Sequence, residues 1–455
     1  MTSKSLWMDI DVAPDARVLD GAQECDVAVI GSGIAGISTA YELCQRGKSV
    51  IVIDRGRICG GMTSRTSAHL APLCDDLVSE MTKIRGHEAT KLFCDSQAAA
   101  IDRIEEIQKI EKIDCDFRRL DGYLFQGRDM PSDIIDQEMD AVREVGAPVH
   151  RLMGVSLKGC EGRHVLRYPR QATFHPLKYL AGVAKACSEN GVTFFRDSPV
   201  VEVTEDNGVV TVKAARGAIR AKHAVVATNS SISDRFAIHT KTAPYRTYVI
   251  TFEIKRGAIP DALYWDTEDP YHYVRLQPGP ANTDYVLVGG EDHKSGEADD
   301  ADERFDRLEA WARSLVSGLG KETHRWSGQR RVGTAPVMDR CSMSTDSQST
   351  LLPSGLSLVW KTERREKAPH RNRGHGGPFG RRHSDRRAMA VRTEMGWLPL
   401  PSGAGGRASR HPFVVRAEPQ PVLSRSHGRR ACGPRKKLCP RWRDRRSDRR
   451  STLTR

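Results

Sequence analysis

The feature that most constrains the fold is a glycine-rich turn, Gly31-Ser-Gly33-Ile-Ala-Gly36, which directly follows the β-branched run Val27–Ile30. Each glycine has a separate steric reason to be there. Gly31 permits a tight turn, Gly33 lets the backbone approach a pyrophosphate, and Gly36 lets a helix pack closely on the strand. The turn therefore predicts the start of a nucleotide-binding βαβ unit.

Downstream of this turn the pattern continues as a helix and a second strand. Apolar residues recur at helical spacing as far as Cys44, and the pattern stops at Gly47. A second apolar run ends at Asp54, eighteen residues after Gly36, and its carboxylate can accept hydrogen bonds from ribose hydroxyls. The stretch predicts an adenine dinucleotide site, with an ordinary βαβ unit that binds no ligand as the alternative. The candidate binding residues are Gly31, Ser32, Gly33, Ile34, Ala35, Gly36 and Asp54.

The fingerprint alone does not distinguish NAD from FAD, because both present the same ADP half to this fold. The loop that follows is more informative. It begins at Arg55 and is rich in small residues from Gly60 to Leu70, including Met62 and Thr63. Its backbone amides and hydroxyls could line an isoalloxazine ring, which favours FAD over the alternative of an NAD-dependent dehydrogenase.

With this loop in view, the chain resembles the FAD-dependent oxidoreductases of the glycine and D-amino acid oxidase family. More narrowly, it is similar to the subgroup that often carries a C-terminal Rieske domain. The resemblance extends from about Ser5 to Gln329. Besides the turn, it depends on residues 60–70, 118–125, 174–176, 197–203, 224–229 and 326–329.

The resemblance implies a fold, a cofactor and a reaction. The fold is α/β, with a Rossmann-like FAD-binding domain and an interleaved antiparallel-sheet substrate domain of the α+β type. Ala227 and Thr228 would approach the flavin, and Val201 would contact the adenine side through its backbone. The reaction would move a hydride from the carbon next to an amine to the flavin, with oxygen or another carrier as electron acceptor.

Periodicity and resemblance together suggest a domain plan. Residues 25–75 and 150–235 would form the FAD-binding domain, and residues 76–149 and 236–329 the substrate domain. Residues 1–24 read as an irregular lead-in. Helices are expected over 75–112, 133–145, from 176 and over 302–319, a hairpin over 200–213, and a strand buried on both faces over 224–227.

Candidate catalytic side chains lie in the strand-rich part. In Tyr271-His-Tyr273-Val-Arg275, alternation puts the two tyrosines and Arg275 on one face, where Arg275 could hold a substrate carboxylate bidentately. The alternative is a solvated strand face with a surface arginine. Arg246 and Tyr248 form a second such pair.

Two histidines have more than one interpretation. His69 lies where some amine dehydrogenases of the family attach the flavin covalently, although a hydrogen-bonding wall residue is the commoner role. His175 precedes Pro176 at an expected helix start, and we interpret it as a capping or packing residue rather than a base.

The C-terminal part differs from the rest. Residues 331–455 hold 29 Lys and Arg against 9 Asp and Glu, whereas the preceding residues hold 42 against 49. We expect a largely disordered tail from residue 330. A shifted reading frame would explain it, and nucleic-acid binding through phosphates is the less favoured interpretation. The flavin-closing segment of the family is not recognisable after Gln329, so an inactive flavoprotein is another alternative.

Composition limits location and metal content. The 11 cysteines include no Cys-x-x-Cys pair and no Cys-x-His, so no Rieske cluster and no metal site are predicted. Cys44 and Cys187 fall on apolar helix faces and are expected in the core. No signal peptide and no long apolar run is apparent, which favours a cytoplasmic protein without a membrane span and with a small amine or amino acid as its partner.

Overall fold

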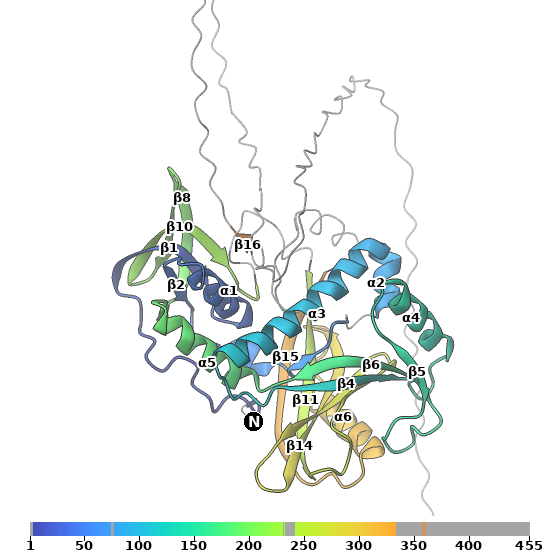
Figure 1. Ribbon diagram of the computed structural model, residues 1–455. Coiled ribbons are helices and arrows are strands. Elements are labelled where there is room, and N and C mark those ends of the chain that lie inside the picture. Colours follow the sequence, from blue (N-terminus) through green and yellow to red (C-terminus); the bar gives the residue numbers. More distant parts are fainter. Residues whose placement is uncertain (1–2, 74–76, 231, 233–241, 334–357, 360–455) are drawn as a thin grey trace, which may run out of the picture. The chain divides into compact units, whose positions relative to one another are not determined.

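The computed structural model describes residues 3–73, 77–230, 232, 242–333 and 358–359, all within the compact unit Met1–Leu398. Two β-sheets organise this part of the chain (Figure 1). The first contains the glycine-rich turn, and the second contains most of the later strands. The α/β fold class expected from the sequence is confirmed.

The first sheet is built around β1 (Gly21–Ile30). β1 pairs in parallel with β2 (Val50–Ile53) on one side and with β10 (Gly217–Val226) on the other. The sheet order is β7-β2-β1-β10-β9-β8, with β7 at Thr193–Phe195, β8 at Val200–Asp206 and β9 at Val209–Ala214. The expected hairpin of β8 and β9 and the buried end of β10 are both confirmed.

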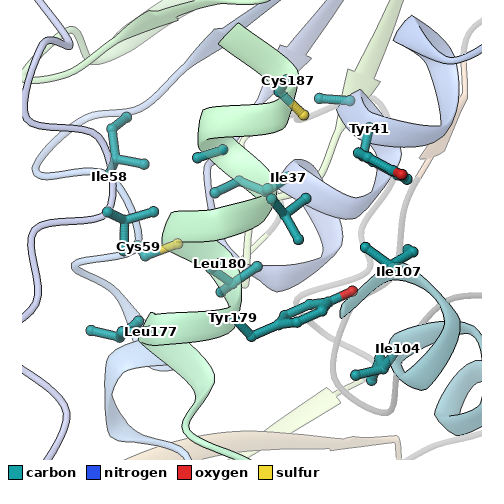
Figure 2. Close-up of a cluster of buried hydrophobic side chains, with 14 of the residues drawn as sticks. Ile37, Tyr41, Ile58, Cys59, Ile104, Ile107, Leu177, Tyr179, Leu180 and Cys187 are labelled. Carbon is teal, nitrogen blue, oxygen red and sulfur yellow. The ribbon is translucent and has the colours of Figure 1, made fainter. Parts of the chain in front are cut away.

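Helices α1 (Ile34–Cys44), α3 (His87–Ile110) and α5 (Pro176–Glu189) share one hydrophobic core. Figure 2 shows the Tyr179 ring pointing from α5 toward Ile104 and Ile107 of α3. Cys44 and Cys187 are buried in the same cluster, as expected. Side chains spaced at helical period therefore join the dinucleotide unit to the long helix of the middle segment.

The second sheet has the order β15-β11-β14-β13-β12-β4-β6-β3, and β5 pairs with β6. Its neighbouring strands are antiparallel except β12 and β4, which are parallel. Helix α6 (Ala301–Leu315) packs against β11 and β14, and its apolar side chains form a separate cluster with this sheet. The strands are β3 (His69–Leu70), β4 (Arg118–Phe125), β5 (His150–Met153), β6 (His164–Thr173), β11 (Thr242–Lys255), β12 (Leu263–Asp266), β13 (His272–Pro278), β14 (Thr283–Lys294) and β15 (Glu322–Gly333).

The remaining described helices follow the expected pattern. The stretch expected to be helical over 75–112 contains α2 (Val78–Arg85) as well as α3, and the next helix is α4 (Asp133–Glu144). A short 3-10 helix, η1 (Met62–Arg65), lies in the loop after β2. Among the helices of the described residues, none has the length and apolar character needed to cross a bilayer.

Sheet membership differs from the sequence-based plan at two places. β5 and β6 lie within 150–173, which we expected in the FAD-binding domain, but they hydrogen-bond into the second sheet. β3 lies within 25–75, a segment also expected in the FAD-binding domain, and it too pairs with β6. Sequence periodicity identifies a strand but not its partner, because pairing is fixed by contacts between distant residues.

The lead-in is more ordered than expected. β1 begins at Gly21, inside the segment 1–24 that we predicted to be irregular, because parallel pairing with β10 extends back to Gly217. Trp7 and Leu19 are fully buried. The first residues therefore pack against the fold rather than merely preceding it.

The expected tail from residue 330 lies almost entirely outside the described residues. Within the described part, β15 continues to Gly333, and β16 (Leu358–Val359) pairs antiparallel with Val225–Val226 of β10. A strand after Gln329 thus adds to the first sheet, where none was expected. The pairing is possible because β9 covers only Ala218–Ala221 on that side of β10.

Candidate flavin site

The glycine turn after β1 is tightly enclosed. Gly31 has φ +103°, and a Cβ there would lie 2.6 Å from the backbone oxygen of Ala227. A Cβ on Gly36 would lie 1.9 Å from the Gly31 oxygen, so helix α1 touches the turn directly. At Gly33 the nearest atom to an added Cβ would be Thr63 Oγ1, at 3.1 Å. Two of the glycines are thus required by packing, and Gly33 faces the loop after β2.

The first turn of α1 is open to an anion. Its N-cap is Gly33, which has no side chain to cap the helix, and no acidic residue lies in its first turn. The Ile34 N–H donates to Thr63 Oγ1 at 3.1 Å. Helix N-termini favour negative charge, so this end of α1 fits the pyrophosphate of a dinucleotide.

Asp54 lies at the end of β2 beside the turn. Its Oδ2 accepts hydrogen bonds from the backbone N–H and the hydroxyl of Ser32, both at 2.7 Å, and its Oδ1 accepts from Gly56 N at 3.0 Å. A carboxylate offers about four acceptor positions, so capacity for a ribose hydroxyl remains. The donor set and the glycine turn therefore fit FAD.

Other predicted cofactor residues surround the same edge of the first sheet. Ala227 N donates to the Ile30 oxygen at 2.8 Å, which brings Ala227 and Thr228 next to the Gly31 turn. The β8–β9 register shifts between Val200 and Glu202, and the side chain of Val201 is 70% exposed. This irregularity suits a backbone contact to adenine.

The remaining predicted cofactor residues lie in the loop after β2. Arg55 is exposed, whereas Met62 and Thr63 are half-buried in η1. The Met62 sulfur accepts from the backbone N–H of Gln329 at 3.2 Å, so the loop touches β15. The loop therefore links the two sheets through described contacts.

His69 ends this loop and meets an aromatic group. Its ring lies 5.7 Å from that of Trp265 and 6.0 Å from that of Tyr273, both edge to face. Burial, followed by the charge of Arg275, lowers the pKa of His69 to about 3. Within the described part of the chain, its Nε2 is buried without a hydrogen-bond partner. His69 is thus a neutral imidazole at physiological pH.

The role predicted for Arg275 is wrong in this structure. Its side chain is fully buried rather than on a solvated face, which also excludes the alternative. Its guanidinium donates to the backbone oxygens of Ser67, Ala68 and Phe174 at 2.9–3.2 Å and to Gln277 Oε1. A group with these acceptors is not free to clamp a carboxylate. Strand alternation correctly placed Arg275 on the same face as Tyr273, but it did not predict which groups accept hydrogen bonds from its guanidinium.

The other predicted aromatic and arginine residues are divided between two environments. Tyr273 is largely buried near His69, and an added Cβ on Gly289 would meet its ring at 2.0 Å. Tyr248 interacts with Arg246 through its side chain, and its ring also packs edge to face on Phe305 of α6. Arg246 lines a cavity of about 490 Å³ together with His293. The pair is thus not beside His69.

Sequence reasoning missed two residues here, Trp265 in this aromatic group and Gln171 beside it. Trp265 stacks on Tyr168 at 5.5 Å and also contacts His69. Gln171 is fully buried, and neither of its amide atoms has a hydrogen-bond partner among the described residues. The Trp in the short run Leu263–Asp266 was the available signal, whereas nothing in the local sequence marks Gln171.

As predicted, His175 caps α5, with its Nδ1 accepting from Lys178 N at 3.2 Å.

A charged cluster occupies the opposite face of the second sheet. His272 Nδ1 lies 3.1 Å from Asp266 Oδ2 and 3.6 Å from Glu268 Oε2, and its Nε2 lies 3.5 Å from Glu291 Oε1. Asp266, Glu268 and His272 are spaced closely enough to hold a metal ion. Although burial opposes the charged form, hydrogen bonds to Asp266 and Glu291 outweigh it and raise the pKa of His272 to about 9. The imidazole of His272 therefore carries its second proton at neutral pH.

Comparison with known proteins agrees with this geometry. The family model described as FAD dependent oxidoreductase matches residues 26–357. The Rieske 2Fe-2S iron-sulfur protein YhfW of Bacillus subtilis is 25% identical over 78% of this chain and 69% of its own length. The oxidoreductase OrdL of Haemophilus influenzae is 31% identical, but the chain covers only 58% of it.

Solved structures support the fold. Glycine oxidase from Geobacillus kaustophilus has a TM-score of 0.56 at 17% identity, covering 68% of this chain and 84% of that chain. NikD, an amino acid oxidase essential for nikkomycin biosynthesis, has a TM-score of 0.54 at 16% identity, covering 69% and 83%. The family's cofactor is FAD, so the alternative of an NAD-dependent dehydrogenase is wrong. The chain belongs to the family of FAD-dependent oxidoreductases.

Proposed function

We propose that the chain oxidises the C–N bond of a small amine or amino acid. The observation that carries the proposal is the meeting of His69, Trp265 and Tyr273, which come from three separate segments, at the end of the loop that follows the dinucleotide unit. When bound, FAD supplies the acceptor for the hydride that leaves the carbon next to the amine.

The chain's own residues would bind and orient both partners. The N-terminus of α1 and Asp54 would hold the pyrophosphate and ribose, while Thr63 and the end of β10 would lie toward the flavin. Ring faces attract an ammonium group, and a neutral His69 places no opposing charge beside it. The aromatic group would thus bind the amine end of the substrate and exclude water from it.

Anaerobic reduction of the bound flavin tests this function. The FAD-loaded chain is mixed with a panel of amines, N-methyl amines and amino acids, and the visible absorbance of the flavin is followed. We expect at least one class to bleach it. Trp265→Leu is expected to slow bleaching at least about tenfold, whereas Trp311→Leu, on α6, leaves the rate unchanged. If only dithionite bleaches the wild type, the proposed reaction is wrong.

Flavin attachment and reoxidation need separate measurements. Colour that remains with the protein pellet after acid precipitation would support a covalent bond to His69, and colour entirely in the supernatant would exclude it. Reoxidation by oxygen or by an added dye would identify the class of acceptor. Each cysteine in the described residues is free, which supports a reducing, cytoplasmic location.

A further inference from the structure

The loop after η1 is held by its backbone oxygens. Five successive carbonyls, those of Ser64–Ala68, each accept a hydrogen bond from a side chain of another segment, and we refer to them as the carbonyl row. Two of the donors belong to the lead-in. Ser5 Oγ donates to the Ser64 oxygen at 2.5 Å, and Trp7 Nε1 donates to the Thr66 oxygen at 2.7 Å.

The other donors come from the second sheet, and one of them is Thr173 Oγ1 of β6, which donates to the Ala68 oxygen at 3.3 Å. Trp326 Nε1, on β15, donates to the Arg65 oxygen at 2.9 Å. Arg275 Nη1, on β13, donates to the Ser67 and Ala68 oxygens at 3.1 and 2.9 Å. The Arg275 guanidinium also lies over the Trp7 ring at 5.5 Å. Segments at both ends of the described chain therefore converge on one loop.

Burial makes these contacts decisive for the loop. All of these donor side chains, including that of Thr173, are fully buried. A buried donor that loses its acceptor costs about 1–3 kcal/mol, so the donors strongly favour the one loop conformation that pairs them all. That conformation includes Ala68 at φ +57°, a region that residues other than glycine rarely adopt. The hydrogen bonds to the row thus hold a backbone shape that the loop would not keep alone.

The opposite side of the same loop meets the dinucleotide unit. Thr63, just before the row, accepts a hydrogen bond from the Ile34 N–H through its Oγ1. The same Oγ1 is the atom nearest to the position that a Cβ on Gly33 would occupy. His69, just after the row, enters the aromatic group. Fixing the carbonyls on one side therefore fixes Thr63 and His69 on the side that faces cofactor and substrate.

We propose that Ser5, Trp7, Arg275 and Trp326 are positioning residues for FAD, acting through the carbonyl row. This rests on the proposed placement of the flavin beside the loop. It assigns to the lead-in, which precedes the nucleotide-binding fold, a direct part in shaping the cofactor site. It also gives buried Arg275 a role in place of the carboxylate contact.

Conservative variants of the full-length chain test the inference. Trp7→Phe and Trp326→Phe keep an aromatic ring and remove the N–H donor, and Ser5→Ala removes the smallest donor. Trp311→Phe is the matched control, since Trp311 stacks on His272 away from the loop. The FAD dissociation constant is measured by titration, together with the absorbance spectrum of bound flavin and the urea midpoint of the apoprotein.

We expect Trp7→Phe and Trp326→Phe each to weaken FAD binding about tenfold and to shift the flavin spectrum, with Trp311→Phe matching the wild type. Wild-type affinity and spectrum in all three donor variants would overturn the inference. The inference would also be overturned if the weaker FAD binding of a variant were fully explained by the fraction of its apoprotein that is unfolded. If the wild type itself binds no FAD, the proposed FAD site is wrong. That result is distinct from one in which the wild type binds FAD and the donor variants bind it equally well, which would contradict only the positioning role.

Discussion

His272 shows how a single residue can carry a large part of the local electrostatics. Its imidazole is enclosed by Asp266, Glu268 and Glu291 and stacks on Trp311 at 4.5 Å. Glu291 in turn pairs with Arg307 at 2.9 Å. The groups facing the ring are predominantly acidic, so its charged form is favoured despite burial. The cluster ties β13 and β14 to α6.

The raised pKa of His272 predicts a pH dependence of stability. Because its folded pKa of about 9 lies above the unfolded value of 6.5, the contribution is fully present below about pH 6.5 and is lost as pH rises through 9. The loss is of the order of 3 kcal/mol. Urea unfolding at pH 6.5 and pH 10 checks this, with His272→Gln as reference. Parallel losses in wild type and variant would contradict it.

Individual residues also show where sequence reasoning reaches its limit. The three glycines of the turn were predictable because the strand, turn and helix that require them are adjacent in the chain, although the atoms nearest to Gly31 and Gly33 belong to the distant Ala227 and Thr63. Capping by His175 is equally local. Arg275 was not predictable, because its acceptors at Ser67, Ala68 and Phe174 are about 100 to 200 residues away in the chain. Alternation along a strand predicts which face Arg275 lies on. It does not predict whether its guanidinium donates to a backbone oxygen or to a substrate carboxylate.

Helix α3 shows how one element joins separate parts of the fold. Ile104 and Ile107 enter the core shared with α1 and α5, whereas Ile110 faces outward at the helix end. The helix also packs against α2. Its apolar stripe thus makes the middle segment a part of the dinucleotide unit's core.

Replacing single isoleucines of α3 by alanine should distinguish the buried face of the helix from its exposed face. Ile104 is 2% exposed, so Ile104→Ala is expected to lower the free energy of unfolding by about 3 kcal/mol through lost burial and a residual cavity. Ile110 is 57% exposed, so Ile110→Ala should change it by no more than about 0.5 kcal/mol. Urea titration of both variants measures the difference, and equal losses would refute the assignment of the buried face.

Helix positions followed closely from sequence, but strand partners did not. The apolar period of α3 and α5 depends only on neighbouring residues. β5 and β6 were not predicted as strands, and nothing local indicated that they join the second sheet. Gln171 of β6 and Trp265 of β12 become neighbours only through this pairing, so the aromatic group of the candidate site was only partly predictable.

The molecule as a whole combines a nucleotide-binding sheet with a second sheet through the loop after β2. Trp326 of β15 and Arg275 of β13 hold that loop from one side, and α1 meets it from the other. The family membership agrees with this arrangement. The strongly basic residues after 359 lie outside the described structure, so the shifted-frame and nucleic-acid interpretations of them stay predictions.

The central claim is that the turn after β1 binds FAD, and a titration of the apoprotein with FAD tests it most directly. Gly33→Val would place a side chain between the turn and Thr63 and should weaken binding at least about 100-fold, or about 2.8 kcal/mol. Gly162→Val, where an added Cβ meets nothing within 4 Å, serves as the control. We predict tight binding by the wild type and the control and little or none by Gly33→Val. Equal binding by all three proteins, or no binding by the wild type, would contradict the account.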